Sequence, residues 1–227
     1  MDAPPAAPPA APPPHRGEGR RTALGAGIAP FLGAGMLTSL VALGWRPLIE
    51  TDTRVARTTH RWATDDPGLT HAVRILTDWV WDPWTMRLAA TLAAVWLVWR
   101  YAAWLTAVWL VVTCDLAILA EQGLKAAVGR PRPTWPDPVD SARYAAFPSG
   151  HAMTATVVCG LLLWLVHRYG AGRRVRRTAF AVAAVSVVGV GATRVWLGVH
   201  WLSDVVGGWL LGALVVALAV AVHPRRA

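Results

Sequence analysis

The sequence has few charged residues and very little lysine or cysteine. Only 15% of its 227 residues are charged, whereas globular proteins average about 25%. Hydrophobic residues make up 55% of the chain and gather in long runs, which favours a membrane protein over a soluble core. The two cysteines, Cys114 and Cys159, fall inside these runs, where small buried side chains are expected rather than a disulfide or metal ligands.

Acidic residues are also scarce, which leaves a formal net charge of +9. The arginines lie in short clusters between the apolar runs, as the positive-inside rule expects of membrane proteins. A nucleic-acid-binding domain more often carries a basic stripe on a polar fold. We therefore expect no nucleic-acid partner.

Residues 1–22 are rich in proline and alanine and end in a basic cluster. Because the prolines forbid a helix, this segment is predicted to be a disordered tail. It does not resemble a signal peptide, since its basic residues come late and the next apolar run is long enough to stay in the membrane. Residues 23–222 are predicted to form one membrane domain, and residues 223–227 a basic C-terminal tail.

The apolar runs predict an all-α fold, an integral membrane bundle of six transmembrane helices. Each spanning helix needs about 20 apolar residues. A further helix at the membrane interface is expected over His71–Trp81. Six spans put both termini on one side, together with the arginine-rich turn at 167–177, and the positive-inside rule makes that side cytoplasmic. The expected spans are Ala23–Trp45, Trp84–Trp99, Ala102–Leu124, Ala152–Val166, Thr178–Val195 and Leu202–Val222.

Three polar islands interrupt the apolar runs, and all three are expected on the outer side. They are Lys125–Pro133, Phe147–His151 and Thr193–Asp204. Lys125 is the only lysine, although the chain has 22 Lys and Arg residues in total. This preference for arginine elsewhere suggests that the position demands a compact point charge, which suits phosphate. A lysine that snorkels from a helix end is the alternative.

The first two islands also carry groups suited to anions. Arg130 and Arg132 each precede a proline, which holds them extended, and a guanidinium fork can grip phosphate oxygens in two places. Two solvated loop arginines would give the same pattern. Ser149 and Gly150 precede an apolar run as a favoured N-cap and a glycine that allows close approach, and a helix N-terminus is a natural anion site. A plain cap would explain these two residues but not His151.

In the third island, His200 and Asp204 are four residues apart. If the last helix begins near His200, the two side chains share a face. The carboxylate can then hold one ring nitrogen as N–H and leave the other free to attack. A histidine and an aspartate at an interfacial helix end are the alternative. Arg194, six residues before His200, is placed to bind phosphate.

Taken together and in this order, the islands resemble the signature of the type 2 phosphatidic acid phosphatase superfamily. The signature has the form K-x-x-x-x-x-x-R-P, then P-S-G-H, then S-R-x-x-x-x-x-H-x-x-x-D. In this sequence it runs from Lys125 to Asp204, and the one departure is Thr193 in place of serine. Threonine keeps the hydroxyl, and the six-span layout extends the resemblance over most of the chain.

The resemblance implies a role for each matching residue. His200 would attack phosphorus to form a phosphohistidine, Asp204 would orient it, and His151 would protonate the leaving oxygen and later assist water. The family needs no metal or other cofactor, and no metal-ligand spacing stands out in the sequence. The groups that would hold the phosphate oxygens are Lys125, Arg132, Ser149, Gly150 and Arg194.

The expected function is therefore that of a lipid phosphatase at the outer surface of the cytoplasmic membrane. Candidate substrates are an isoprenoid diphosphate such as undecaprenyl diphosphate, phosphatidic acid or phosphatidylglycerol phosphate. A vanadate-dependent haloperoxidase has a similar signature, but such enzymes are soluble and larger. A non-enzymatic membrane transporter that retained the motifs is the other alternative. The sequence assigns no role to Asp115, which lies deep in an expected span, and it leaves the oligomeric state open.

Overall fold

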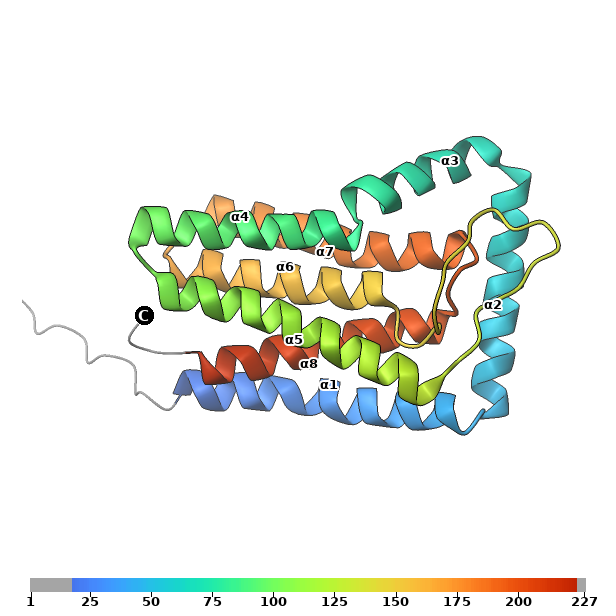
Figure 1. Cartoon of the computed structure of the whole chain (residues 1–227), viewed down its shortest axis with the longest axis horizontal. Helices are drawn as coiled ribbons and strands as arrows, with labels where there is room; N and C mark the ends of the chain where they lie inside the picture. The colour runs from blue at the N-terminus through green and yellow to red at the C-terminus, as the bar shows by residue number, and fades with distance from the viewer. Residues whose placement is uncertain (1–17, 224–227) are drawn as a thin grey trace, which may run out of the picture.

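The computed structural model describes residues 18–223. Over that range every element of regular secondary structure is a helix, and the elements are joined by turns and by one long loop at residues 129–149 (Figure 1). This confirms the all-α prediction for the described residues. Residues 1–17 and 224–227, which hold most of the two predicted tails, lie outside the described range. In chain order the elements are α1 (Glu18–Ala42), α2 (Arg46–Asp65), α3 (Pro67–Ile75), a π-helical segment η1 (Leu76–Val80), α4 (Pro83–Tyr101), α5 (Trp104–Val128), α6 (Gly150–Arg168), α7 (Arg173–Trp196) and α8 (Leu202–Val222).

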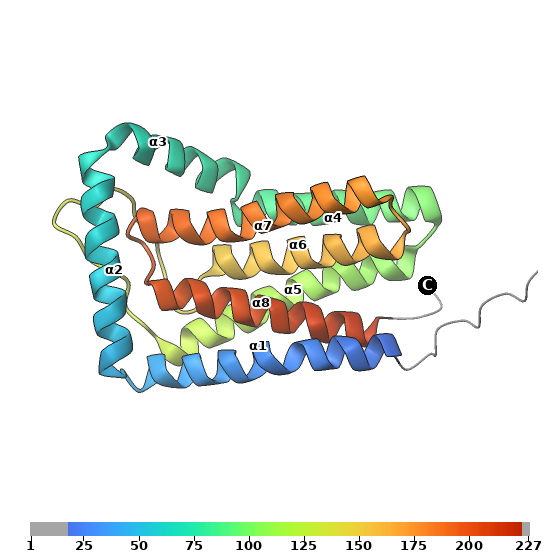
Figure 2. The same ribbon diagram turned by 180° about the vertical axis from the view of Figure 1, so that it is seen from behind.

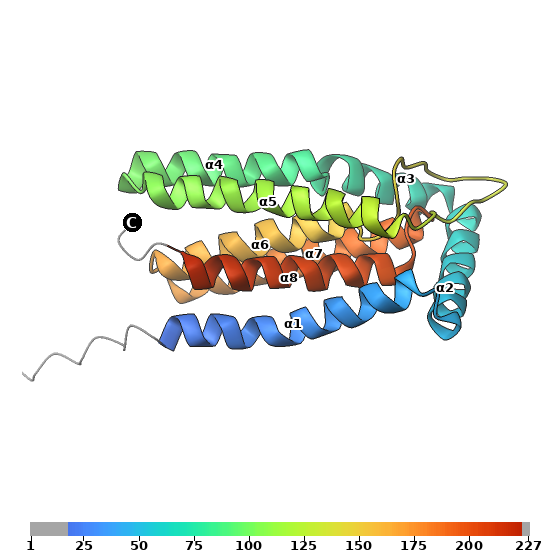
Figure 3. The ribbon, with the colours of Figure 1, turned by 60° about the horizontal axis from the view of Figure 1, so that its bottom comes forward.

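The long helices lie side by side in one bundle. Figures 1, 2 and 3 show α1, α4, α5, α6, α7 and α8 running along a common direction, while α2 crosses one end. The α5–α6 loop and the α7–α8 connection reach the end that α2 covers. The start of α1 and the end of α8 lie at the opposite end (Figure 1). The three polar islands are therefore brought to a single end of the bundle.

Five of the bundle helices are long and apolar enough to cross a membrane. Helix α4, which covers the expected span Trp84–Trp99, falls outside this set. It is less apolar because it carries Arg87 and Arg100 along with several tryptophans. The six-span expectation is thus supported for five segments only, although α4 packs along α5 and α6 within the bundle. The five segments are Arg21–Ala42, Trp104–Val128, Gly150–Arg168, Arg173–Trp196 and Leu202–Val222.

Two boundaries also differ from expectation. Helix α1 begins at Glu18, inside the segment that was expected to be a disordered tail up to residue 22. The expected interfacial helix over His71–Trp81 corresponds to the second half of α3 and to η1. Asp115 lies on an exposed part of the α5 surface, rather than in the interior of the bundle.

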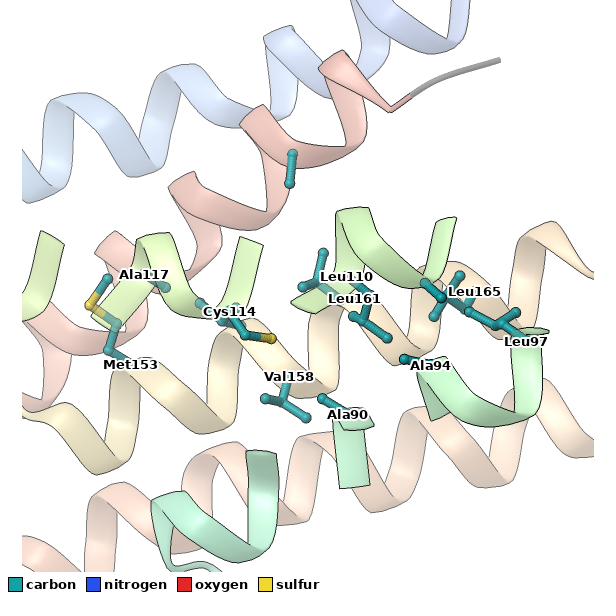
Figure 4. Packing of buried hydrophobic residues seen from close by; sticks show 13 residues of the cluster. Ala90, Ala94, Leu97, Leu110, Cys114, Ala117, Met153, Val158, Leu161 and Leu165 are labelled. Atoms are coloured by element: carbon teal, nitrogen blue, oxygen red, sulfur yellow. The ribbon is translucent and has the colours of Figure 1, made fainter. Parts of the chain in front are cut away.

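The core of the bundle is formed by small and branched apolar side chains from α4, α5, α6 and α8. Leu110 and Leu161 are fully buried at its centre, with Ala90 against them from α4. Figure 4 shows these side chains meeting between the ribbons. Because little hydrophobic force drives helices together within lipid, such close packing is what holds a membrane bundle together.

Glycines on α8 allow two other segments to approach its backbone. A Cβ built on Gly208 would lie 2.7 Å from the Ser149 carbonyl oxygen, and one on Gly212 would lie 3.0 Å from the Met153 oxygen. A Cβ on Gly207 would lie 2.5 Å from the ring of Phe147, which is fully buried. The first turn of α6, its N-cap Ser149 and the Phe147 ring therefore pack directly against the α8 backbone.

Helix α2 has one face that packs on the bundle end and one that is exposed. Its buried residues are Asp52, Ala56, His60 and Ala63, which recur at helical spacing. The Thr59 hydroxyl donates to the Val195 carbonyl of α7 at 3.2 Å. These contacts fix α2 across the end of the bundle where the polar islands meet.

We expect the α6–α8 contact to be intolerant of side chains. Gly212→Val should lower the thermal midpoint of the detergent-solubilised protein, since overpacking costs typically 1–3 kcal/mol. Gly35→Val on α1, where a Cβ would meet nothing within 4 Å, is the matched control. Equal midpoints for the two variants would show that the close approach does not limit stability.

Candidate active site

The second island forms the N-terminus of α6. Ser149 is its N-cap, and its side chain accepts a hydrogen bond from the Ala152 backbone N–H, as predicted. The Ser149 N–H donates to the Asp204 carbonyl oxygen at 2.9 Å. A Cβ on Gly150 would collide with the Glu121 carboxylate of α5. The helix N-terminus is thus held between α8 and α5, with glycine at the point of closest approach.

His200 lies in the turn between α7 and α8, where Gly198 has a φ of 66° that a side chain would strain. Helix α8 begins at Leu202, so His200 is not on the helix as expected. The expected contact forms nevertheless, because Asp204 Oδ2 accepts from the Trp201 N–H at 2.9 Å and lies 3.3 Å from His200 Nδ1. Helix capping therefore sets the carboxylate against the ring.

Arg132 reaches the other side of the His200 ring. Its Nη1 donates to the Val199 carbonyl at 2.6 Å and lies 3.0 Å from His200 Nε2. A guanidinium can only donate and an ionised carboxylate can only accept. The contacts of Arg132 and Asp204 therefore favour the tautomer with a proton on Nδ1 and a lone pair on Nε2, which accepts from Arg132.

Burial lowers the pKa of the His200 imidazole well below its usual range, and Arg132, Arg194 and Lys125 lower it further. Burial, with Arg194 nearby, also lowers the pKa of Arg132 to about 10, which leaves that guanidinium charged at neutral pH. A neutral histidine is thus surrounded by cations. The same three cations and the His200 ring are also neighbours of His151, so all three islands meet around the two histidines.

Two of these cations are paired with carboxylates. Lys125 Nζ lies 2.7 Å from Glu121 Oε1, one helical turn earlier, and both side chains are nearly buried. This burial argues against a snorkelling lysine. Arg194 Nη1 lies 3.7 Å from Asp140 of the α5–α6 loop, and the buried Nε of Arg194 has no hydrogen-bond partner. The Arg194 side chain therefore keeps an unused donor at the site.

The structure also shows contacts that the sequence reasoning did not predict. Arg130 is buried and bonded to Asp204 and to Asp52 of α2, which rules out a solvated loop arginine. The ion pair between Glu121 and Lys125 could have been predicted, because an acidic and a basic residue lie four positions apart in a segment expected to be helical. The pairing of Asp52 with Arg130 had no signal, because 78 residues separate them. Within residues 18–223, no three His, Cys, Asp or Glu side chains are grouped to hold a metal ion.

Comparison with known proteins identifies the family. Residues 106–227, more than half of the chain, match the model of the PAP2 superfamily. The chain belongs to the PAP2 superfamily. The matched range contains every residue of the three islands, which confirms the resemblance on which their interpretation was based.

Several PAP2 relatives act on lipids, as their names state. The chain is 36% identical over 101 residues to phosphatidylglycerophosphatase B of Bacillus subtilis, which is 44% of this chain and 49% of that protein. It is 31% identical over 88 residues to undecaprenyl-diphosphatase of Sulfolobus acidocaldarius, 39% and 36% of the two chains. It is also 32% identical over 111 residues to lipid A 1-phosphatase of Rhizobium etli, 45% and 44%. The matches span about half or less of these relatives.

The fold agrees over a larger range. A crystal structure of the transmembrane PAP2-type phosphatidylglycerolphosphate phosphatase of Bacillus subtilis matches 85% of this chain and 93% of its own, with a TM-score of 0.76 at 23% identity. That match extends the shared architecture beyond the three polar islands. Together with its apolar helices, it makes this PAP2 protein a multi-pass membrane protein.

We expect His200 to stay neutral when the pH falls through the normal histidine range, because protonation would add charge in a buried, cationic site. With 15N-histidine labelling in detergent, its ring should keep the Nδ1–H tautomer through the pH range around ~6.5 in which an ordinary histidine becomes protonated. The His200→Gln spectrum identifies the resonance by its loss. A His200 signal that titrates near pH 6.5 would contradict this account of the site.

Proposed function

We propose that this protein is a lipid phosphatase that needs no metal and works through a phosphohistidine. The observation that carries the proposal is the placement of the His200 ring, with Asp204 at one nitrogen and Arg132 at the other. Such a ring is an oriented nucleophile. The named relatives, all phosphatases of lipid substrates, support the same reaction class. The transporter alternative would leave this arrangement without a use.

In the proposed first step, His200 Nε2 donates its lone pair to phosphorus while the bond from phosphorus to the lipid oxygen breaks. The leaving oxygen takes a proton from His151. Nδ1 keeps its proton and donates a hydrogen bond to Asp204, whose negative charge stabilises the positive charge of the phosphorylated ring. In the second step water attacks phosphorus and gives a proton to His151, and the bond from phosphorus to Nε2 breaks.

The cations around His200 take the part that a metal has in other phosphatases. Lys125, Arg132 and Arg194 surround the position where charge develops on the phosphate oxygens, and preorganised charges of this kind are a major source of catalysis. The backbone N–H groups at Gly150 and His151 and the Ser149 side chain complete the phosphate cradle. The bound phosphate also supplies the negative charge that favours a protonated His151.

We further propose that the site faces the extracytoplasmic side of the cytoplasmic membrane. The arginines of residues 168–177 belong to the turn between α6 and α7, which lies at the end of the bundle opposite the polar islands (Figure 1). The positive-inside rule makes that end cytoplasmic. A lipid phosphate in the outer leaflet could then reach the site from the bilayer. The substrate class comprises isoprenoid diphosphates such as undecaprenyl diphosphate, phosphatidic acid and phosphatidylglycerol phosphate.

The covalent intermediate gives a direct test. Wild-type protein with excess EDTA should take up 32P from labelled lipid phosphate, and the label should survive alkali but not acid. His200→Ala should take up no label and release no phosphate while remaining folded. Asp204→Asn favours the wrong tautomer and should lose activity, by up to the roughly ten-thousand-fold seen for such a change in the serine protease triad. Label that persists in His200→Ala would place the nucleophile elsewhere.

The orientation has its own test. In a background without Cys114 and Cys159, single cysteines at Ser141 in the α5–α6 loop and at Ala171 in the α6–α7 turn should react differently with an impermeant thiol reagent on intact cells. Ser141→Cys should label and Ala171→Cys should label only after lysis. Equal labelling of the two would refute the topology and leave the chemistry untouched.

A further inference from the structure

Arg130 lies between two buried carboxylates. Its Nη1 donates to Asp204 Oδ1 at 2.6 Å and to the Ser203 hydroxyl at 2.7 Å, and its Nη2 donates to Asp52 Oδ2 at 2.7 Å. Arg130 is 8% exposed, Asp52 1% and Asp204 not at all. One guanidinium fork therefore joins α2, the first island and the first turn of α8.

Stability alone is a weak reason for such an arrangement. Desolvating three charges is costly, and well-packed apolar residues in place of a buried ion pair are often as stable or more so. The trio also ends beside the candidate catalytic histidine, because the second carboxylate oxygen of Asp204 lies 3.3 Å from His200 Nδ1.

The contacts divide the two oxygens of Asp204 between separate tasks. Oδ2 takes the Trp201 N–H and faces His200 Nδ1, while Oδ1 takes Arg130. Arg130 thus fixes the rotation of the carboxylate about its last bond and stabilises its ionised form. The stacking of the guanidinium over the Trp201 ring, at 5.5 Å, and the bond from Trp201 Nε1 to the Pro131 carbonyl hold Arg130 in this position.

Asp52 extends the same support to α2. It accepts the Ser203 N–H at 2.9 Å and the Ser203 hydroxyl, in addition to Arg130. Asp52 therefore binds both the residue before Asp204 and the cation that holds Asp204. The helix that lies across the bundle end is tied through this one side chain to the carboxylate beneath the nucleophile.

We propose that Arg130 and Asp52 are positioning residues, which hold Asp204 ionised and aligned so that His200 keeps its proton on Nδ1 and its lone pair on Nε2. Neither side chain touches the phosphate cradle, so both act on the reaction through Asp204. The proposal rests on the proposed function for its effect on rate, but the alignment of His200 is a claim about the protein without substrate.

The first test therefore needs no activity. In 15N-histidine spectra of the detergent-solubilised protein, Arg130→Gln and Asp52→Asn should each move His200 from the Nδ1–H tautomer toward a mixture. Arg54→Gln, an exposed arginine two residues from Asp52 on the same helix, should leave the spectrum unchanged. Unchanged His200 tautomers in both test variants would overturn the proposal, whatever the protein hydrolyses.

The second test uses phosphate release from a short-chain lipid phosphate. Asp52→Asn and Arg130→Gln should lower kcat roughly 10- to 100-fold, as is common for groups that orient a reacting residue, with KM nearly unchanged. Arg130→Lys keeps the charge without the fork and should recover part of kcat. Because Arg130→Gln alone leaves two carboxylates facing each other, the charge-balanced double variant Asp52→Asn/Arg130→Gln serves as the folded reference.

The outcomes separate the two ideas. If the wild type releases no phosphate from any lipid while the tautomer shifts as expected, the proposed function fails and the positioning role stands. If the variants lower kcat only in step with a loss of thermal stability, and the tautomer stays fixed in the folded double variant, the cluster is structural and the positioning role is overturned.

Discussion

The arrangement of the candidate site depends on one fully buried carboxylate, that of Asp204. Asp204 is not exposed to water, so its charge must be balanced within the protein, because an unpaired buried ion is very costly. Its side chain is met by Arg130, the Trp201 N–H and His200, while its backbone carbonyl accepts the Ser149 N–H. Each polar island thus supplies at least one partner to this single residue, and their convergence follows from that need.

The cations of the site face the opposite problem, because they must be stable before phosphate arrives. Lys125 is paired with Glu121, and Arg194 lies near Asp140. These carboxylates supply negative charge next to the cations, as phosphate oxygens would. They therefore lower the electrostatic free energy of grouping three positive charges. Arg132 is instead held by backbone carbonyls at Tyr144 and Val199, which fix its direction without neutralising it. Under the proposed function, the phosphate group would meet one guanidinium beside His200 that is held by backbone carbonyls rather than by a carboxylate, and two cations for which it would compete with carboxylates.

The sequence was most informative where chemistry and spacing are local. Ser149 as an N-cap and the contact of His200 with Asp204 both follow from residues within one helical turn, and the structure contains both. Helix α8 has the bounds expected for the last span, Leu202–Val222, and His200 reaches Asp204 from the turn before it, because the capping that draws the two together needs no helical residue at 200. The roles of Arg130 and Asp52 could not be read at all, since a solvated arginine and a buried one look alike until the partner from α2 is in place. Helix α4 was expected to be a span because its arginines lie near the two ends of an otherwise apolar run, but its hydropathy is too low to place it among the five candidate spans.

Helix α8 ties together groups that come from the ends of several helices and from the loops beside them. The helix packs on α1 along one side and on α6 along the other, and its glycines seat the N-terminus of α6 and the ring of Phe147 directly on its backbone. Its first turn holds Asp204 and Ser203, to which the first island and α2 are bonded. Loops alone would leave the phosphate cradle free to shift by more than catalysis tolerates, since misplacement by about 1 Å can cost a hundredfold in rate. Anchoring these segments to the same rigid helix end restricts that movement, and the anchoring contacts involve the first turn of α8 rather than Lys125, Arg132 or Arg194.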